Sequence, residues 1–106
     1  MISEERVEAA VEFIRDHANR LGYLIGHAKA LEYQLKVVEA QNYLDATGTI
    51  EARRSKARSS PEYKAIIEEI ENAWAEKATL ETKLKAAELT IDVWRSQYSK
   101  MGKGHL

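Results

Sequence analysis

The sequence predicts an all-α fold: a long antiparallel helical hairpin of coiled-coil type, with a short basic linker or third helix between its arms, assembling into a homo-oligomer. The first observation is composition, because 15 alanines, one proline, five glycines and 31% charged residues are typical of long helices. The others are apolar residues at steps of three and four along two long segments, and capping residues at their ends. At 106 residues the chain is expected to form one domain, residues 1–106.

The first helix is expected over residues 3–46. Ser3 is a typical N-cap residue, and Thr47-Gly48 supplies the left-handed position that often follows a helix. Apolar residues at steps of three and four define one face, which is interrupted once by two successive steps of three: Val7, Val11, Ile14, Ala18, Leu21, Leu24, Ala28, Leu31, Leu35 and Val38. This face is expected to pack along a second helix.

The second helix is expected over residues 61–101, with a frayed tail at 102–106. Ser59 and Ser60 offer a serine cap, Pro61 suits the first turn, and Glu62 is placed to complete a capping box. A heptad seam follows without a slip, and all its members except Lys77 are apolar: Tyr63, Ile66, Ile70, Ala73, Lys77, Leu80, Leu84, Ala87, Ile91, Trp94, Tyr98 and Met101. Such a seam predicts coiled-coil packing.

Residues at and beside this seam predict an oligomer interface. Ile67 and Trp74 lie at flanking positions and widen the apolar stripe beyond what one facing helix covers. A third helix, from another copy of the chain, is therefore expected to pack there, although a partly exposed tryptophan in a monomeric hairpin is the alternative. Lys77 is a candidate register or oligomer-state residue within the seam, and Trp94 is a further seam aromatic.

The linker over residues 47–60 is the most basic part of the chain. Within residues 48–60 there are four cations and one acid, and the cations are Arg53, Arg54, Lys56 and Arg58. Thr49 is a possible cap for a short helix, around which these cations would spread instead of lining one side. Broadly presented positive charge suits a phosphate backbone better than a single carboxylate. Tyr43, close to this linker, is a candidate to stack on a base.

No constellation of catalytic residues is present, so an enzyme is not expected. The chain has no cysteine, no glycine-rich phosphate loop and no Glu-x-x-His pair, and neither a cofactor nor a metal is expected. His17 and His27 do not share a helix face, and His105 falls in the expected tail. The N-terminal residues lack a signal-peptide pattern, and no run of about 18 apolar residues occurs, so a cytoplasmic protein without a membrane partner is expected.

The stretch from Ala28 to Ser96 resembles the UvsY-type recombination mediators of tailed phages. The resemblance rests on Lys36-Val37, on Thr47-Gly48 before the basic stretch, on Ser60 with Tyr63, and on the run Ile91-Asp92-Val93-Trp94-Arg95. It implies a ring-like homo-oligomer that binds single-stranded DNA. It further implies that the oligomer helps to load a RecA-like recombinase onto DNA coated by single-strand-binding protein, in the cytoplasm of a bacterial host.

One departure from the family pattern affects the expected DNA site. The family carries a basic and aromatic motif just before the turn, and here that segment, residues 39–45, contains no cation. Lys36, Asn42 and Tyr43 retain suitable contact chemistry, and the cations at 53–58 would carry most of the binding. A DNA-recombination accessory protein is therefore the leading hypothesis. The alternative is a coiled-coil structural or adaptor protein whose basic linker binds an acidic protein surface.

Overall fold

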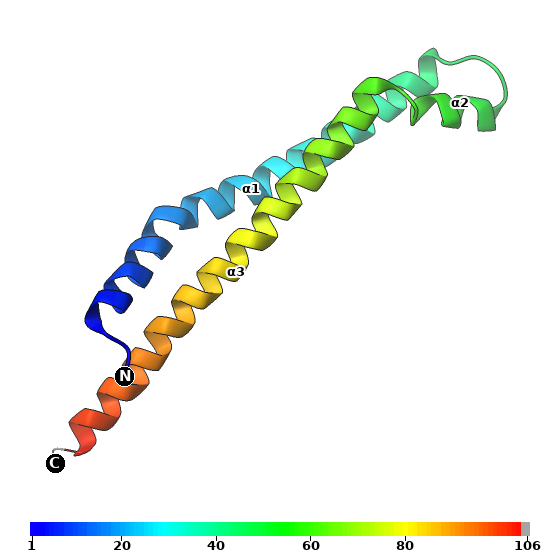
Figure 1. Cartoon of the computed structure of the whole chain (residues 1–106). Helices are drawn as coiled ribbons and strands as arrows, with labels where there is room; N and C mark the ends of the chain where they lie inside the picture. Colours follow the sequence, from blue (N-terminus) through cyan, green and yellow to red (C-terminus); the bar gives the residue numbers. More distant parts are fainter. Residues whose placement is uncertain (105–106) are drawn as a thin grey trace. The chain divides into compact units, whose positions relative to one another are not determined.

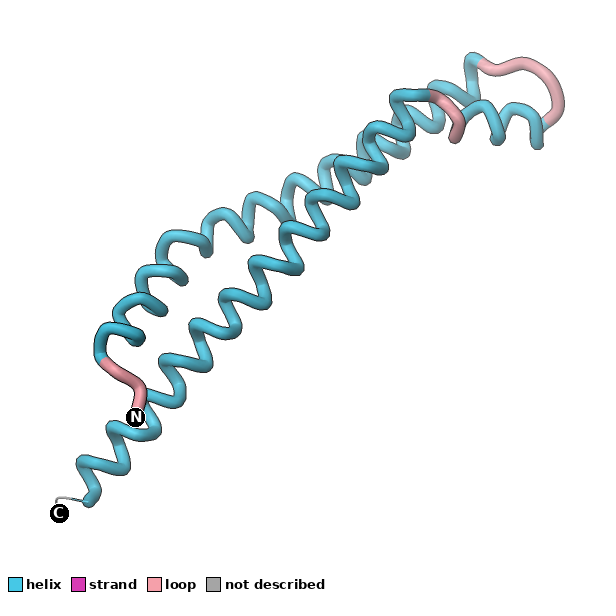
Figure 2. The backbone as a smooth tube through the Cα atoms, in the orientation of Figure 1, coloured by secondary structure: helices cyan, strands magenta, loops and turns pink. Residues whose placement is uncertain are grey.

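The computed structural model describes residues 1–104, and the predicted tail residue His105 lies outside the described residues. Those residues form three α-helices and no strand: α1 (Glu4–Asp45), α2 (Ile50–Ala57) and α3 (Pro61–Gly104) (Figure 1). The all-α class expected from the sequence is therefore confirmed. The linker contains a short helix bounded by two loops (Figure 2). The helix expected to end at residue 101 continues to Gly104, into the segment expected to fray.

Each helix begins at a hydroxyl cap of the kind that the sequence predicts. The side-chain oxygens of Ser3, Thr49 and Ser60 each accept a hydrogen bond from the backbone N–H three residues later, at 3.3, 3.1 and 3.1 Å. These bonds satisfy N–H groups that have no partner within the first turn of a helix. Gly48, in the loop after α1, has φ +111°, a conformation that residues with a Cβ rarely adopt. Local chemistry thus explains where the elements start and where the chain turns.

The fold has two compact units, and both α1 and α3 contribute to each of them. One unit consists of residues 23–77, which contain the second part of α1, the whole of α2 and the first part of α3. The other combines residues 1–22 with the chain from Ala78 onward. The expected single domain stays a prediction.

In the unit of residues 23–77, α1 and α3 lie side by side in opposite directions, and α2 lies where they are connected (Figure 1). Its hydrophobic core contains the buried side chains Leu31, Val38 and Ile66, against which Leu35, Tyr63 and Ile70 pack. Ala57, at the end of α2, is 1% exposed, which shows that the short helix is packed against the hairpin. The segment that connects α1 to α3 is thus packed into this unit.

In the other unit, the N-terminal part of α1 is held to the C-terminal part of α3. The backbone N–H of Ile2 donates to Oε1 of Gln97 at 2.9 Å. Val7 and Ala10 of α1 are buried, as are Leu80, Leu84 and Ala87 of α3. Trp94 lines a small pocket of about 230 Å³ with residues of the first turns of α1.

The apolar face of α1 differs from the predicted one at two positions. Ala10 is buried and His17 is half-buried, whereas Val11 is 38% exposed and Ala18 is exposed. With these replacements the predicted break in the seam is wrong. The covered positions follow alternating steps of three and four: Val7, Ala10, Ile14, His17, Leu21, Leu24, Ala28, Leu31, Leu35, Val38 and Asn42. Heptad register, and not the apolarity of each residue, decides which side chain faces inward.

His17 fits this seam because one of its ring nitrogens has a hydrogen-bond partner within the helix. Its Nδ1 is hydrogen-bonded to the carbonyl oxygen of Phe13 at 2.8 Å, and its ring stacks on the Phe13 ring with centroids 4.1 Å apart. A hydrogen-bonded imidazole can be partly buried at low cost.

The seam of α3 follows the prediction as far as Trp94. Its members up to that residue are buried or half-buried, including Lys77. Tyr98 and Met101 are 64% and 48% exposed, so the last two predicted seam positions are wrong. They follow Gln97, where the segment preceding α1 reaches α3. Beyond the facing helix, an apolar heptad residue has only its own helix to pack on, as Tyr98 does against Trp94.

Asn42 occupies a half-buried seam position and connects three segments of the chain. Its Nδ2 donates to the carbonyl oxygen of Ala57 at 3.1 Å and to Oγ of Ser60 at 2.9 Å. Because Ser60 Oγ also accepts the Tyr63 N–H, one α1 side chain is bonded to the end of α2 and to the cap of α3. An amide provides two donors from one nitrogen, which suits this position better than any apolar residue.

We predict that Asn42→Ala lowers the free energy of unfolding by about 1–3 kcal/mol, because it removes two hydrogen bonds and leaves half-buried acceptors without their donor. Urea unfolding followed by circular dichroism measures this change. Gln41→Ala, at the exposed neighbouring position, is the matched control and should change stability by less than about 0.5 kcal/mol. Equal effects of the two substitutions would contradict the assigned role of Asn42.

Candidate nucleic-acid interface

The four predicted cations lie on α2 and at its C-terminal end, close to the end of α1. Arg53, Arg54 and Lys56 are within the helix, and Arg58 is its C-cap residue. Arg53 is half-buried and the other three are exposed. They differ in what they contact, so their availability to a ligand differs as well.

Arg53 is stacked on Tyr43. Its guanidinium carbon lies 4.2 Å from the centroid of the Tyr43 ring, and its Nε donates to the Tyr43 carbonyl oxygen at 3.2 Å. The two residues are ten positions apart, and α2 brings them together after the turn at Gly48. A guanidinium plane on an aromatic ring is a recurrent cation–π arrangement and presents a flat, positively charged surface.

Arg58 and Lys56 are bound to α1 and to the loop that follows it. Arg58 Nε donates to Oε1 of Glu39 at 3.0 Å, and this hydrogen bond together with the carboxylate charge raises the pKa of the Arg58 guanidinium. Lys56 Nζ donates to the Thr47 carbonyl oxygen at 3.4 Å. By contrast, Arg54 makes no side-chain hydrogen bond or ion pair within residues 1–104 and remains exposed.

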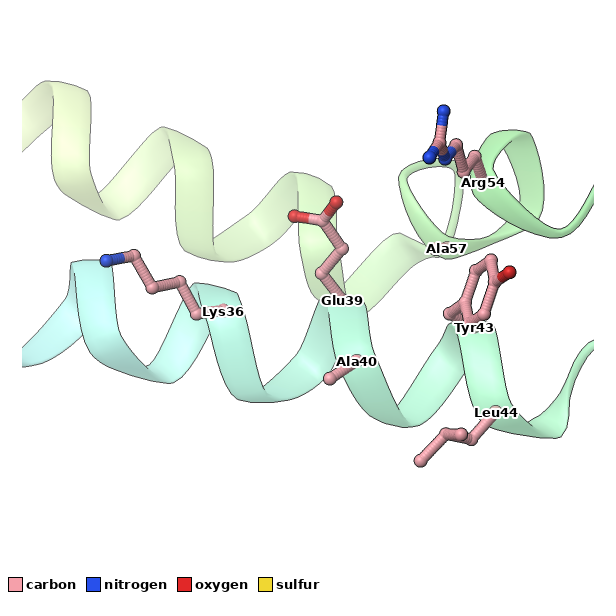
Figure 3. Close-up of a pocket in the computed structure, with 7 residues that line it drawn as sticks. All are labelled: Lys36, Glu39, Ala40, Tyr43, Leu44, Arg54 and Ala57. Carbon is pink, nitrogen blue, oxygen red and sulfur yellow. The ribbon is translucent and has the colours of Figure 1, made fainter. Parts of the chain in front are cut away.

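An open groove of about 480 Å³ lies between the end of α1 and α2, and we call it the Tyr43 groove. Its lining combines cationic, acidic, aromatic and small apolar residues: Lys36, Glu39, Ala40, Tyr43, Leu44, Arg54 and Ala57 (Figure 3). Figure 3 shows the Tyr43 ring rising from α1 toward α2, with Arg54 extending from α2 above it. Lys36 lies at one end of the groove (Figure 3). Its Nζ is also 5.6 Å from the centroid of the Tyr33 ring.

The groove contains three of the six residues predicted to bind nucleic acid, namely Lys36, Tyr43 and Arg54. Arg53 adjoins it through Tyr43, and Arg58 reaches it through Glu39. Lys56 is directed to the loop after α1 and does not line the groove.

Sequence reasoning missed four of the lining residues: Glu39, Ala40, Leu44 and Ala57. A signal was present, because positions 36, 40 and 43 follow helical spacing on one side of α1. The segment 39–45 contains no cation of its own, and in the structure Arg54 of α2 brings one beside it. Only the return of the chain after Gly48 places it there.

The residues predicted for an oligomer interface are half-buried within the chain. Trp74 Nε1 donates to Oε1 of Glu32 at 3.3 Å, and Lys77 Nζ lies 4.9 Å from the Trp74 ring centroid. Ile67 is half-buried on α3, and Trp94 stacks on Tyr98 with centroids 5.5 Å apart. An interface through these residues stays a prediction.

Two further kinds of site are absent from the described part of the chain. No three side chains of His, Cys, Asp or Glu come together there in a way that would hold a metal ion. None of the helices, within the same residues, combines the length and the apolar character that a membrane span requires.

Comparisons with protein-family models, with curated proteins and with solved structures found no match to this chain.

We predict that Thr49→Ala loosens α2, because the substitution removes the hydroxyl that caps its first turn. A loss of about 1 kcal/mol of local stability should raise amide hydrogen exchange at Ala52 and Arg53 by roughly fivefold. Exchange measured by NMR tests this expectation. Thr47→Ala, in the same loop, is the control, and equal acceleration by both substitutions would contradict the cap.

Proposed function

We propose that this chain binds single-stranded DNA through the Tyr43 groove and the adjoining cations of α2. The chemistry required is positive charge for the phosphates and a flat surface on which a base can stack. Within residues 23–77 the groove combines both, since Lys36 and Arg54 flank the Tyr43 ring and Arg53 lies over it.

The stacked pair of Tyr43 and Arg53 carries the proposal. Bases stack on aromatic rings and on guanidinium planes without regard to sequence, because every base has a π-face. Double-stranded DNA offers no unstacked base, so a single strand is the form that suits this pair.

The charges around the groove support a phosphate ligand. Glu39 is the acid in the lining, and its ion pair with Arg58 compensates its charge. The exposed cations Lys36 and Arg54 are then left to meet phosphates. The affinity from contacts of this kind falls as the salt concentration rises, because each phosphate that is neutralised releases counterions.

The resemblance to UvsY-type mediators extends the proposal to an accessory role in DNA recombination. In that role a homo-oligomer would gather several grooves along one DNA strand, so that weak single contacts add up. A RecA-like recombinase and a single-strand-binding protein would be its protein partners. This extension is carried by the sequence resemblance alone.

A second candidate is a coiled-coil adaptor that binds proteins without nucleic acid. The exposure of large apolar side chains on α1 and α2 favours it, since Leu44 is 72% exposed and Ile50 is 60% exposed. Exposed apolar residues that cluster on one face often mark protein-interaction sites. The titration below separates the two candidates.

We predict salt-sensitive binding of labelled single-stranded DNA, measured by fluorescence anisotropy. The double variant Lys36→Ala and Arg54→Ala should bind roughly tenfold more weakly, with a salt slope smaller by about 1.4, which is about 0.7 for each lost phosphate contact. Arg53, Lys56 and Arg58 are less suitable targets because they bind within the fold.

The control for this titration is Lys83→Ala with Lys85→Ala, which removes the same charge from exposed positions of the other unit. It should leave affinity within about twofold. Absence of salt-sensitive binding by the wild-type chain, or an equal loss in both double variants, would overturn the proposed function.

We predict the opposite effect for Glu39→Gln. Removing the carboxylate takes a negative charge out of the groove and releases Arg58 from its ion pair, so affinity for single-stranded DNA should rise by roughly two- to fivefold at low salt. The same anisotropy titration measures it. Unchanged or weaker binding would mean that the strand does not pass along this groove.

A further inference from the structure

α1 carries a second line of uncharged residues in heptad spacing, in addition to the seam that packs on α3. We call it the outer stripe. Its members follow steps of three and four without a slip and all lie in the unit of residues 23–77: Tyr23, Gly26, Ala30, Tyr33, Val37, Ala40 and Leu44. Such spacing repeated over three heptads is the pattern by which one helix packs along another.

The outer stripe is exposed to solvent in the part of the chain that the structure describes. All seven positions are exposed, and the four large ones, Tyr23, Tyr33, Val37 and Leu44, are exposed by 56%, 70%, 55% and 72%. Figure 3 shows Ala40 and Leu44 extending from the side of α1 that faces away from α3. The heptad pattern ends at Tyr23, because the preceding positions in the same register are Asn19, Asp16 and Glu12.

From this arrangement we propose that the outer stripe binds the outer stripe of a second copy of the chain, in a parallel, two-fold symmetric pair. A second copy offers a stripe of the same length, spacing and register, which is what a symmetric interface requires. Each large residue of the stripe also has a small neighbour along it, with Gly26 after Tyr23, Ala30 before Tyr33 and Ala40 after Val37. Bulky side chains of one helix thereby find space beside small residues of the other.

The area of the stripe is sufficient for such a pair. The two tyrosines, with about 200 Å² of side chain each, are exposed by 56% and 70% and together offer roughly 250 Å². The remaining five members bring the total to on the order of 500 Å² for each copy. A pair then buries on the order of 1,000 Å², which is where specific interfaces begin.

The charges beside the stripe favour the parallel orientation. Lys29 and Lys36 lie along one flank, and Gln34 and Gln41 lie along the other. In a parallel pair, each lysine meets a glutamine of the partner, whose amide oxygen can accept its N–H. In an antiparallel pair, Lys29 would instead face the partner's Lys36, and like charges would meet.

The pair also deepens the proposed function, and this part of the inference rests on it. Lys36, Ala40 and Leu44 line the Tyr43 groove and lie on or beside the outer stripe. A parallel pair therefore places two grooves at the same end of the dimer. One DNA strand could then contact both, which raises affinity by effective concentration.

The mass of the full-length chain in solution tests the pair. Light scattering should give twice the chain mass of 12.0 kDa. Val37→Glu should raise the dimer dissociation constant by roughly a hundredfold, because the two introduced carboxylates meet across the symmetry axis. Leu89→Glu is the matched control, because Leu89 is also exposed, at 62%, but lies on α3 in the other unit. It should leave the mass unchanged.

Two outcomes would overturn the pair. One is a wild-type chain that stays monomeric at roughly 0.1 mM, where an interface of this size should be populated. The other is an assembly that Val37→Glu and Leu89→Glu affect equally. Circular dichroism of both variants should match the wild type, since both replaced side chains are exposed.

Cysteine crosslinking tests the orientation. The chain has no cysteine, so a single substitution introduces one unique thiol. In a parallel pair, Ala30→Cys should give a disulfide-linked dimer with oxidised glutathione, because each position 30 lies opposite its own copy. Leu89→Cys should not crosslink. A dimer in which Ala30→Cys also fails to crosslink would contradict the parallel arrangement.

The failure of this inference and that of the proposed function can be told apart. A dimer that binds no single-stranded DNA would leave the pair intact and remove the proposed function. A monomer that binds DNA through Lys36 and Arg54 would do the reverse. If both hold, Val37→Glu should weaken DNA binding, although its carboxylate lies outside the groove lining, while Leu89→Glu should not.

Discussion

The hydrogen bonds of Asn42 are the constraint on which the connecting end of the hairpin depends. The Asn42 amide nitrogen donates to the carbonyl oxygen of Ala57, the last residue of α2, and to the Ser60 hydroxyl that caps α3. The three helices are thereby fixed to one another at a single side chain. Without this link, α2 would be held by the packing of Ala57 and by the contacts of Arg53 with Tyr43 and of Arg58 with Glu39. A polar residue at a seam position also restricts register, because shifting either helix by a turn would leave its donors unmatched.

That constraint explains why the candidate site lies where it does. The cations of α2 reach α1 only because the short helix is packed back onto the end of the hairpin. Once it is there, Arg53 covers Tyr43, Arg58 compensates Glu39, and Arg54 borders the groove. The segment of α1 between residues 23 and 44 thus has three distinct sides: its seam packs on α3, α2 lies beside the groove, and the outer stripe is exposed.

Much of the fold could be predicted from the sequence, because its determinants are local. Ser3, Thr49 and Ser60 cap the helices, and Gly48 takes the left-handed conformation after α1, as capping chemistry predicts. The errors on α1 lie where local character and helical register disagree. Val11 is more apolar than Ala10, yet Ala10 is buried, because only Ala10 continues the alternation of steps that Leu21 and Leu24 set farther along the helix. The site could be predicted only in part for a related reason. Glu39 of α1 and Arg54 of α2 line the same groove because the two helices pack together, and the spacing of residues along one helix does not reveal such packing.

The end of α1 depends electrostatically on another helix. A helix C-terminus carries partial negative charge, which is usually balanced by a basic residue in its own last turn, but the last turn of α1 has none. Arg53, at the Tyr43 carbonyl, and Lys56, at the Thr47 carbonyl, supply that charge from α2. The last turn of α1 and the whole of α2 should therefore fray as one cooperative segment, and added salt should loosen both by screening the same attraction.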